Sequence, residues 1–158
     1  MKAFVLIGSP GSGKSTAARK LAKEHNAAIV SGDDIRRKLY GDAPNQGNWS
    51  DIHDKIVEQL EENADKSVIL DGTHYCSSYR VGAQITLKTY GWDEIIAYVV
   101  NPSLERCIVQ NSLRSRKVPR YVLIEMWEKL QVSLPDLPNE GFSDIVYADT
   151  VYNNGEGV

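Results

Sequence analysis

The sequence lacks the features that mark several classes of protein. It has only two cysteines, Cys76 and Cys107, and neither has a CxxC partner or a histidine at ligand spacing. This pattern argues against a zinc site and favours a reducing compartment, for which the cytoplasm is the default. No apolar run approaches the length of a membrane span, and the N-terminus leads straight into a predicted strand. We therefore expect neither a membrane segment nor a signal peptide.

Positive charge is also scarce. The formal net charge is −3 at pH 7, so the basic surface of a protein that coats nucleic acid is missing. Any contact with nucleic acid must therefore be local, with a shallow salt dependence of binding. With 158 residues, 42% of them apolar and 25% charged, and without repeats or low-complexity tracts, the sequence is typical of a globular protein. We expect one domain over residues 1–158, with a frayed tail at 153–158.

The most informative segment is the glycine-rich stretch GSPGSGKST at residues 8–16. It follows the apolar run 3–7, which predicts a buried strand, and precedes the helical run 17–22. Glycines at three positions allow positive φ, so that successive N–H groups converge on phosphates at a helix start. The pattern predicts a P-loop that binds ATP through Gly8, Ser9, Pro10, Gly11, Ser12, Gly13, Lys14, Ser15 and Thr16.

Single residues of this loop have expected roles. Lys14 would reach the β- and γ-phosphates, and the hydroxyl of Ser15 would be a ligand of Mg²⁺, a cation that keeps most of its waters and takes few protein oxygens. The side chain of Thr16 is expected to be structural.

Strand patterns alternate with helical patterns along the rest of the sequence, which predicts an α/β fold with a parallel sheet and helices on both faces. We expect the P-loop NTPase arrangement of adenylate-kinase-like proteins, with about five strands and a short lid. The predicted strands are 3–7, 27–30, 67–71, 95–100 and 144–147, and the predicted helices after 17–22 begin near 33, 52, 78, 102 and 118, with a polar loop at 41–50.

A second candidate site follows the second strand, where Asp33, Asp34 and Arg36 stand at a helix start. Loops at this edge of an open α/β sheet gather around a ligand. Phosphoryl transfer to a hydroxyl needs a base for the acceptor proton and a cation that holds the acceptor, and Asp33 and Arg36 could supply them. The alternative is that Asp33 caps the helix and Arg36 is a surface charge, with Asp34 as another candidate cap.

A third candidate site is the end of the third strand, which reads Asp71-Gly72-Thr73-His74. In P-loop proteins a carboxylate at this place commonly holds Mg²⁺ through a water, so Asp71 is a metal and acceptor-site candidate. Thr73 and His74 could line the acceptor site, although a hydrogen-bonded structural role suits His74 equally. His25 and His53 are expected at the surface.

A fourth site concentrates cations in the stretch 110–120. A lid over about residues 111–119 would place arginines on the triphosphate and exclude water, with Arg114 as the first candidate and Arg116 as the second. The alternative is a solvated basic turn. The apolar residues that follow, from Val122 to Leu130, are expected to pack rather than to bind a ligand.

Together these motifs resemble the 5′-kinase module of phage-type polynucleotide kinases. The resemblance covers about residues 3–133 and rests on GSPGSGKST, DDIR, DGTH, the Tyr90-Gly91-Trp92 triplet and NSLRSRKVP. It implies that Lys14 and Ser15 serve ATP and Mg²⁺, and that Asp33 is the general base for a 5′-hydroxyl. It also implies that Arg36 holds the 3′-phosphate of the terminal nucleotide. The phosphatase domain of some members is not expected, because the sequence has no DxDGT motif.

The resemblance assigns a lid arginine on the donor phosphates to Arg114, and the sequence departs from the family nearby. Gln110 stands where some members carry a second lid arginine, for which Arg116 is a candidate substitute. Gly72 stands where some members carry the strand-end carboxylate, which weakens the assignment of Asp71.

The implied reaction is ATP-dependent phosphorylation of the 5′-hydroxyl end of DNA or RNA. Tyr40 and Trp49 could stack a terminal base, with core packing as the alternative. A P-loop kinase for a small molecule, such as a nucleoside, an antibiotic or a sugar nucleotide, is a rival interpretation. A non-catalytic nucleotide-binding module is another. No sequence motif specifies an oligomeric state.

Overall fold

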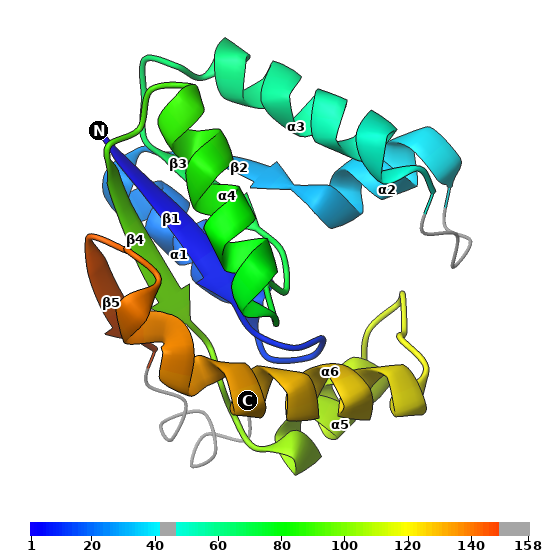
Figure 1. Ribbon diagram of the computed structural model, residues 1–158. Helices are drawn as coiled ribbons and strands as arrows, with labels where there is room; N and C mark the ends of the chain where they lie inside the picture. The colour runs from blue at the N-terminus through cyan, green and yellow to red at the C-terminus, as the bar shows by residue number, and fades with distance from the viewer. Residues whose placement is uncertain (42–46, 149–158) are drawn as a thin grey trace.

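The computed structural model describes residues 1–41 and 47–148 of the chain, and in this part five parallel strands form one sheet (Figure 1). The order across the sheet is β2-β3-β1-β4-β5. This confirms the predicted α/β fold with a parallel sheet. The strands are β1 (Lys2–Ile7), β2 (Ala28–Ser31), β3 (Val68–Asp71), β4 (Glu94–Val99) and β5 (Asp144–Tyr147).

Strand β1 forms the centre of the sheet because its residues are apolar on both faces. Alternate side chains of a strand point to opposite faces, and here Ala3, Val5 and Ile7 join one core cluster while Phe4 and Leu6 join the other. Both clusters are closed to solvent by helices, as a buried parallel sheet requires. The carboxyl end of this buried strand leads directly into the glycine-rich loop.

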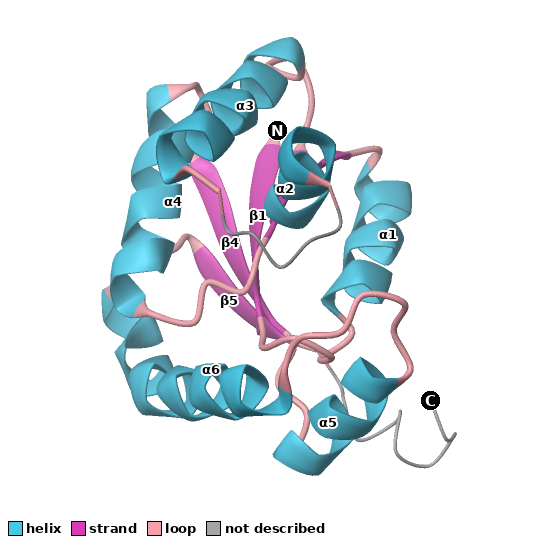
Figure 2. Ribbon diagram, turned by 90° about the vertical axis from the view of Figure 1, so that its right-hand side faces the viewer, coloured by secondary structure: helices cyan, strands magenta, loops and turns pink. Residues whose placement is uncertain are grey.

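Helices cover both faces of the sheet. Figure 2 shows α1 on one side and α3 and α4 on the other, and the two core clusters contain residues of these helices. The bounds are α1 (Lys14–His25), α2 (Gly32–Tyr40), α3 (Trp49–Glu62), α4 (Ser77–Thr89), α5 (Leu104–Ser112), α6 (Arg120–Ser133) and the 3₁₀ helix η1 (Leu134–Asn139). Within the described residues, no helix combines the length and the apolar character needed to cross a bilayer.

Several local expectations are wrong. Pro102 does not open α5, because Ser103 is the N-cap and its hydroxyl accepts a hydrogen bond from the Arg106 N–H at 3.2 Å. The helix α3 already begins at Trp49, inside the stretch expected to be loop. His25 and His53 are half-buried rather than at the surface. Part of the expected loop (residues 42–46) and the expected frayed tail (residues 153–158) lie outside the described residues.

Candidate active site

The glycine-rich loop joins β1 to α1, and its conformation explains two of its glycines. Gly11 (φ 78°) and Gly13 (φ 98°) have positive φ, and Gly13 is the N-cap of α1. A β-carbon on Gly11 would also collide with the carbonyl oxygen of Cys107 in α5. Gly8 does not have the positive φ expected for it. It is needed for close approach, because a β-carbon there would lie 2.5 Å from the Val100 carbonyl oxygen.

Two polar side chains of the loop, Lys14 and Ser12, point into the loop itself. The Lys14 ammonium donates a hydrogen bond to the Ser9 carbonyl oxygen at 3.1 Å, so the side chain lies across the loop. The hydroxyl of Ser12 is buried and has no hydrogen-bond partner among the described residues. A buried polar atom without a partner costs free energy. A bound phosphate oxygen would give this hydroxyl an acceptor.

Lys14 and the strand-end carboxylate Asp71 influence each other electrostatically. Burial lowers the pKa of Lys14, and the charges of Asp71 and Asp33 oppose this shift. Burial raises the pKa of Asp71, and the charge of Lys14 opposes this shift. The ammonium group therefore lies within electrostatic reach of two carboxylates, one after β2 and one at the end of β3.

Pairing of β2 with β3 explains why these carboxylates are near each other. Ser31, the last residue of β2, is in register with Asp71, the last residue of β3. The helix α2 begins one residue after Ser31, so its first turn starts at the same edge of the sheet. In open α/β folds this carboxyl edge is where ligands bind.

Asp33 does not cap α2, and neither does Asp34. The N-cap is Ser31, whose hydroxyl accepts a hydrogen bond from the Asp34 N–H at 3.2 Å. Asp33 is 59% exposed and forms an ion pair with Arg36 Nη1 at 3.2 Å. An exposed pair of this kind contributes about 0–1 kcal/mol. The helix therefore gains little from either side chain, and both can contact a ligand.

The loop after β3 is fastened to the P-loop region. The Gly8 N–H donates to the Thr73 carbonyl oxygen at 3.0 Å, and the His74 ring lies 2.7 Å from the Leu6 carbonyl oxygen through Nδ1. Since a carbonyl can only accept, Nδ1 carries the proton. Burial lowers the pKa of His74 to about 4 although its backbone hydrogen bonds oppose this. His74 is thus a neutral ring that holds the loop to β1, as its structural alternative requires.

The cationic stretch forms an irregular segment between α5 and α6. It covers residues 113–119, shorter than the expected lid, because α5 continues to Ser112. Arg114 and Arg116 are half-buried. The charge of Arg114 acts on Lys14 and on Asp71, so this arginine is within electrostatic reach of the loop. Nη1 of Arg116 is buried without a partner in the described part of the chain.

Two residues at the end of α5 connect the loop and the lid segment. The Gln110 amide donates to the Gly11 carbonyl oxygen at 2.6 Å. The Asn111 side chain donates to the Val118 carbonyl oxygen at 2.8 Å and accepts from the Val118 N–H at 3.1 Å. Sequence reasoning noted Gln110 only as a departure from a family pattern. Because Gln110 is uncharged where some members carry an arginine, the sequence could have suggested a neutral hydrogen bond at this position, and it offered no other indication.

Arg80 is a further residue that sequence reasoning missed. It is fully buried in α4 and forms a two-pronged ion pair with Glu140, through Nε and Nη2 at 2.7 Å each. Its Nη1 also donates to the His74 carbonyl oxygen at 3.1 Å. Arg80 therefore supports the loop after β3 from behind. The sequence around Arg80 could not predict this ion pair, since Glu140 is 60 positions away.

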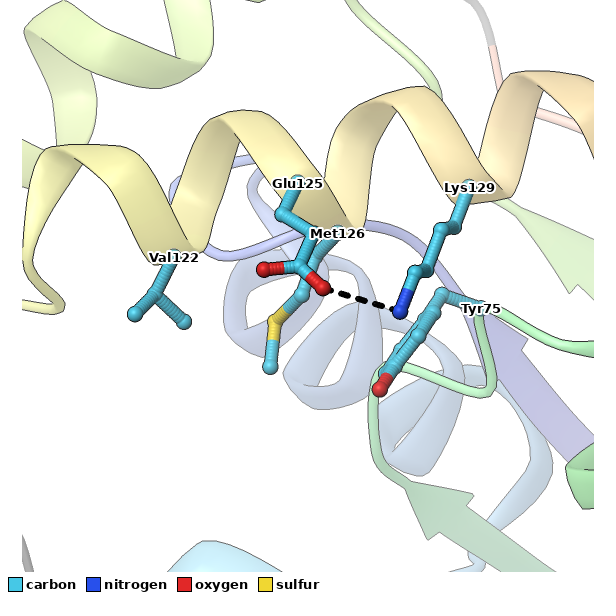
Figure 3. Close-up of a pocket in the computed structure, with 5 residues that line it drawn as sticks. All are labelled: Tyr75, Val122, Glu125, Met126 and Lys129. Carbon is cyan, nitrogen blue, oxygen red and sulfur yellow. Dashed lines mark ion pairs between the residues drawn. The ribbon is translucent and has the colours of Figure 1, made fainter.

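Two cavities lie beside these elements and away from the P-loop itself. One, of 120 Å³, lies between α6 and the loop after β3, and its lining residues are drawn in Figure 3: Tyr75, Val122, Glu125, Met126 and Lys129. The other, of 310 Å³, is lined by Leu39, Tyr40, Asp51, Asp54 and Lys55. As expected for the apolar residues of α6, Leu123 and Leu130 are buried in the core. Val122 and Met126 line the first cavity instead.

The donor set fits Mg²⁺. Ser15 stands at the start of α1 and Asp71 at the end of β3. Across residues 1–41 and 47–148, no three histidine, cysteine or carboxylate side chains gather into a cluster that would bind a metal by themselves. A cation that keeps its waters and takes its other oxygens from a nucleotide needs no such cluster.

One family profile matches most of this chain, and one known protein matches about a third of it. The sequence profile of the AAA domain family, AAA_33, matches residues 4–134. The shikimate kinase of Corynebacterium efficiens is 39% identical over 57 residues, which cover 36% of this chain and 33% of that protein. The chain thus spans about a third of that relative.

Solved structures share the fold at lower identity. A chain of the Pnkp1/Rnl/Hen1 RNA repair complex has a TM-score of 0.74 and 23% identity, covering 85% of this chain and 45% of that one. A gluconokinase from Sinorhizobium meliloti 1021 has a TM-score of 0.60 and 19% identity, covering 92% and 81%. Chaetomium thermophilum Kti12 in complex with ADP-AlF3 has a TM-score of 0.65 and 18% identity, covering 97% and 94%.

The family match covers well over half of the chain, and it includes the glycine-rich loop, α2 and the cationic segment. The five-stranded parallel sheet with helices on both faces is a P-loop kinase-like fold. The chain therefore belongs to the AAA domain family, as a P-loop protein of the kinase-like kind.

Proposed function

We propose that this protein is a polynucleotide 5′-hydroxyl kinase, which transfers the γ-phosphate of ATP to the 5′-hydroxyl end of DNA or RNA. The observation that carries the proposal is the position of Asp33. This carboxylate lies in the first turn of α2, at the carboxyl edge of the sheet. It does not cap the helix, and its charge acts on Lys14. A kinase for a hydroxyl acceptor needs a base at this place.

The transfer step follows from these groups. Asp33 accepts the proton of the acceptor hydroxyl as its oxygen attacks the γ-phosphorus in line, and the bond from the phosphorus to the β,γ-bridging oxygen breaks to release ADP. Lys14 neutralises charge on the β- and γ-phosphates, and the backbone N–H groups from Gly11 to Ser15 hold them. The Ser12 hydroxyl, which lacks a partner within the described residues, donates to a phosphate oxygen.

The lid segment completes the donor site. Arg114 and Arg116 contact the phosphates and offset the charge that develops during transfer, as arginine fingers do. Gln110 keeps the Gly11 peptide in place through its 2.6 Å hydrogen bond. Ser15 as a direct ligand and Asp71 through a water would hold Mg²⁺, which would supply positive charge to offset that of the phosphates.

On the acceptor side, Arg36 binds a phosphate and Thr73 lines the acceptor site. In this proposal residues 1–158 work as one kinase domain, and the acceptor enters between α2 and the loop after β3. The likeness to a chain from an RNA repair complex, with a TM-score of 0.74, supports a nucleic-acid acceptor.

A small-molecule acceptor is the second candidate. The matches to shikimate kinase and to gluconokinase favour it, since both act on small acceptors by name. In that case Asp33 and Lys14 keep their roles, and Arg36 binds an anionic group of a small acceptor. A nucleotide-binding module without catalysis is the alternative of a different class, and it needs no base at position 33.

Transfer of labelled γ-phosphate tests the proposal directly. The panel contains a 5′-hydroxyl oligodeoxynucleotide, the matching oligoribonucleotide, a nucleoside 3′-monophosphate, free nucleosides, shikimate and gluconate, each with ATP and Mg²⁺. We expect label on the oligonucleotides. Label confined to a free nucleoside or to an acid would identify a small-molecule kinase instead, and nucleotide binding without label on any acceptor would favour the non-catalytic module.

Arg36→Ala is expected to raise the acceptor KM by about 10- to 100-fold, the effect of losing a charge-assisted hydrogen bond to a phosphate. The rise should occur for acceptors with a 3′-phosphate on the terminal nucleotide and not for acceptors without one. Steady-state kinetics on a nucleoside 3′-monophosphate and the free nucleoside measures this. Arg37→Ala is the control, because Arg37 is on the same helix and pairs with Asp34 at 3.4 Å. Equal effects of Arg36→Ala on both acceptors would contradict the role.

A further inference from the structure

The second half of α5 packs directly against the phosphate loop. A β-carbon on Gly11 would collide with the Cys107 carbonyl oxygen and would lie 3.0 Å from the Asn111 backbone nitrogen. The Ser9 hydroxyl lies 3.4 Å from the Cys107 sulfur. The loop therefore contacts α5 at two places, and a residue with a side chain at position 11 could not come this close.

One side chain of α5 adds a polar link to this contact. The Gln110 amide donates a hydrogen bond to the Gly11 carbonyl oxygen at 2.6 Å. In the same peptide unit, the Ser12 N–H donates to the Ser9 carbonyl oxygen at 3.2 Å. Both polar groups of this peptide are therefore held, one of them from another element of the fold. The N–H groups that follow it are those expected to face the phosphates, so its orientation affects them directly.

The next residue of α5 holds the lid segment, drawn in yellow in Figure 1. The Asn111 side chain exchanges two hydrogen bonds with the backbone of Val118. The Asn111 carbonyl oxygen accepts a third from the Arg114 N–H at 3.2 Å. Gln110 and Asn111 are consecutive, so a single step along the chain separates the contact to the phosphate loop from the contacts to the lid segment.

This short connection holds two like charges near each other. Burial lowers the pKa of Lys14 in the phosphate loop, and the charge of Arg114 in the lid segment adds to this shift. Two cations within electrostatic reach repel each other until an anion lies between them. A fixed link between the two segments opposes this repulsion. The amide of Gln110 supplies the link without adding a third positive charge.

We propose that Gln110 is a positioning residue of the donor site, which fixes the phosphate loop to the lid segment so that Lys14 and Arg114 meet the same triphosphate. The proposal rests on the ATP-binding part of the proposed function and adds a dependence to it. The contribution of Arg114 to ATP affinity depends on the hydrogen bond from Gln110 to the Gly11 carbonyl oxygen. The identity of the acceptor plays no part in this role.

A double-variant cycle on equilibrium binding of ATP with Mg²⁺ tests the dependence. Gln110→Met keeps the length of the side chain and removes its donor, and Arg114→Ala removes the lid cation. We expect Gln110→Met to raise the Kd for ATP by about 2- to 10-fold, the effect of losing one hydrogen bond. In the double variant the rise should be smaller, by at least about 2-fold, than the product of the two single effects, because coupled residues are not additive.

Two further variants separate positioning from folding. Gln110→Ala removes the same donor in a residue that suits a helix, and it should give the same result if the methionine packs poorly. Gln131→Met is the matched control, because the Gln131 amide makes its hydrogen bonds with Asn101, at 2.8 and 3.1 Å. The control should keep the wild-type Kd for ATP and should combine multiplicatively with Arg114→Ala.

The outcomes distinguish this proposal from the proposed function. Multiplicative effects in the cycle, or a wild-type Kd in both Gln110→Met and Gln110→Ala, would overturn the positioning role whether or not an acceptor is phosphorylated. Effects smaller than multiplicative would support the role even if no oligonucleotide received label, since equilibrium binding of ATP needs no acceptor. If the wild-type protein bound no ATP, both proposals would fail together.

Discussion

Asp33→Asn is expected to lower kcat for phosphoryl transfer by about 10²- to 10⁴-fold, the usual contribution of a general base. The affinity for ATP should stay nearly unchanged, because the contacts to the triphosphate come from the P-loop and the lid segment. Asparagine keeps the size of the side chain but removes its capacity to accept a proton, together with its negative charge and the ion pair to Arg36. Single-turnover transfer and equilibrium ATP binding, measured on the same preparation, check both parts.

Asp34→Asn is the matched control for this experiment. Asp34 is in the same first turn of α2, and its side chain pairs with Arg37 at 3.4 Å. It should retain wild-type kcat. Loss of a helix cap should not confuse the result of Asp33→Asn, since Ser31 rather than Asp33 caps α2. Wild-type turnover in Asp33→Asn would contradict the mechanism.

Arg80→Ala is expected to lower the free energy of unfolding by about 3–5 kcal/mol, the cost of leaving one member of a buried ion pair without its partner. Arg80 and Glu140 have side-chain exposures of 0% and 4%. The substitution also removes the donors to the carbonyl oxygens of His74 and Ser133. Because native proteins have only about 5–15 kcal/mol of stability in total, the loss should be plain in equilibrium denaturation with urea at pH 7.

The pH dependence gives a second readout of this pair. Burial would raise the pKa of Glu140, but hydrogen bonds from Arg80 and Ser77 and the charge of Arg80 together hold it below the ordinary 4.5. A lowered folded-state pKa stabilises the fold above the unfolded-state pKa, and the gain is lost as pH falls through the folded-state pKa. Wild-type stability should therefore decline below about pH 4.5. In Arg80→Ala only the Ser77 hydrogen bond still opposes burial, so this particular loss should become smaller.

The double variant Arg80→Met with Glu140→Leu separates charge from packing. Replacing both partners of a buried pair by apolar groups of similar volume is often neutral or stabilising, so the double variant should recover much of the stability lost in Arg80→Ala. A single variant within about 1 kcal/mol of wild type would contradict the assigned role, since that is the range of an exposed pair.

Features carried by consecutive residues are predictable from this sequence. The apolar run that forms β1 predicts a strand buried on both faces. The glycine spacing of the loop predicts positive φ, which occurs at Gly11 and Gly13. The alternation of strands and helices then implies a parallel sheet. The short edge strand β5 is also predicted at the residues where it occurs, Asp144–Tyr147.

The cap of α2 is a case in which local reasoning has several answers. Ser31, Asp33 and Asp34 are all good N-cap residues by type. The choice depends on where the strand ends, because Ser31 keeps the extended backbone of β2 (φ −115°, ψ 121°) and its hydroxyl then faces the first turn. This is a property of the sheet rather than of the three residues concerned.

Long-range contacts account for the rest. Gln110 meets Gly11 across 99 positions, and Arg80 meets Glu140 across 60. The cavity at Tyr75 needs α6 and the loop after β3 to be adjacent, and no residue pattern in either segment specifies that. Residue types restrict what such groups can do, but only the chain topology decides which of them meet.

The two hydrogen bonds between the Asn111 side chain and the Val118 backbone affect how the length of the segment between α5 and α6 can vary. These bonds fix both ends of the lid segment independently of what lies between them. Extra residues inserted at the tip would change mainly the entropy of loop closure, about 0.6 kcal/mol for each doubling of length. The segment between α5 and α6 can therefore be lengthened while the two helices stay where they are.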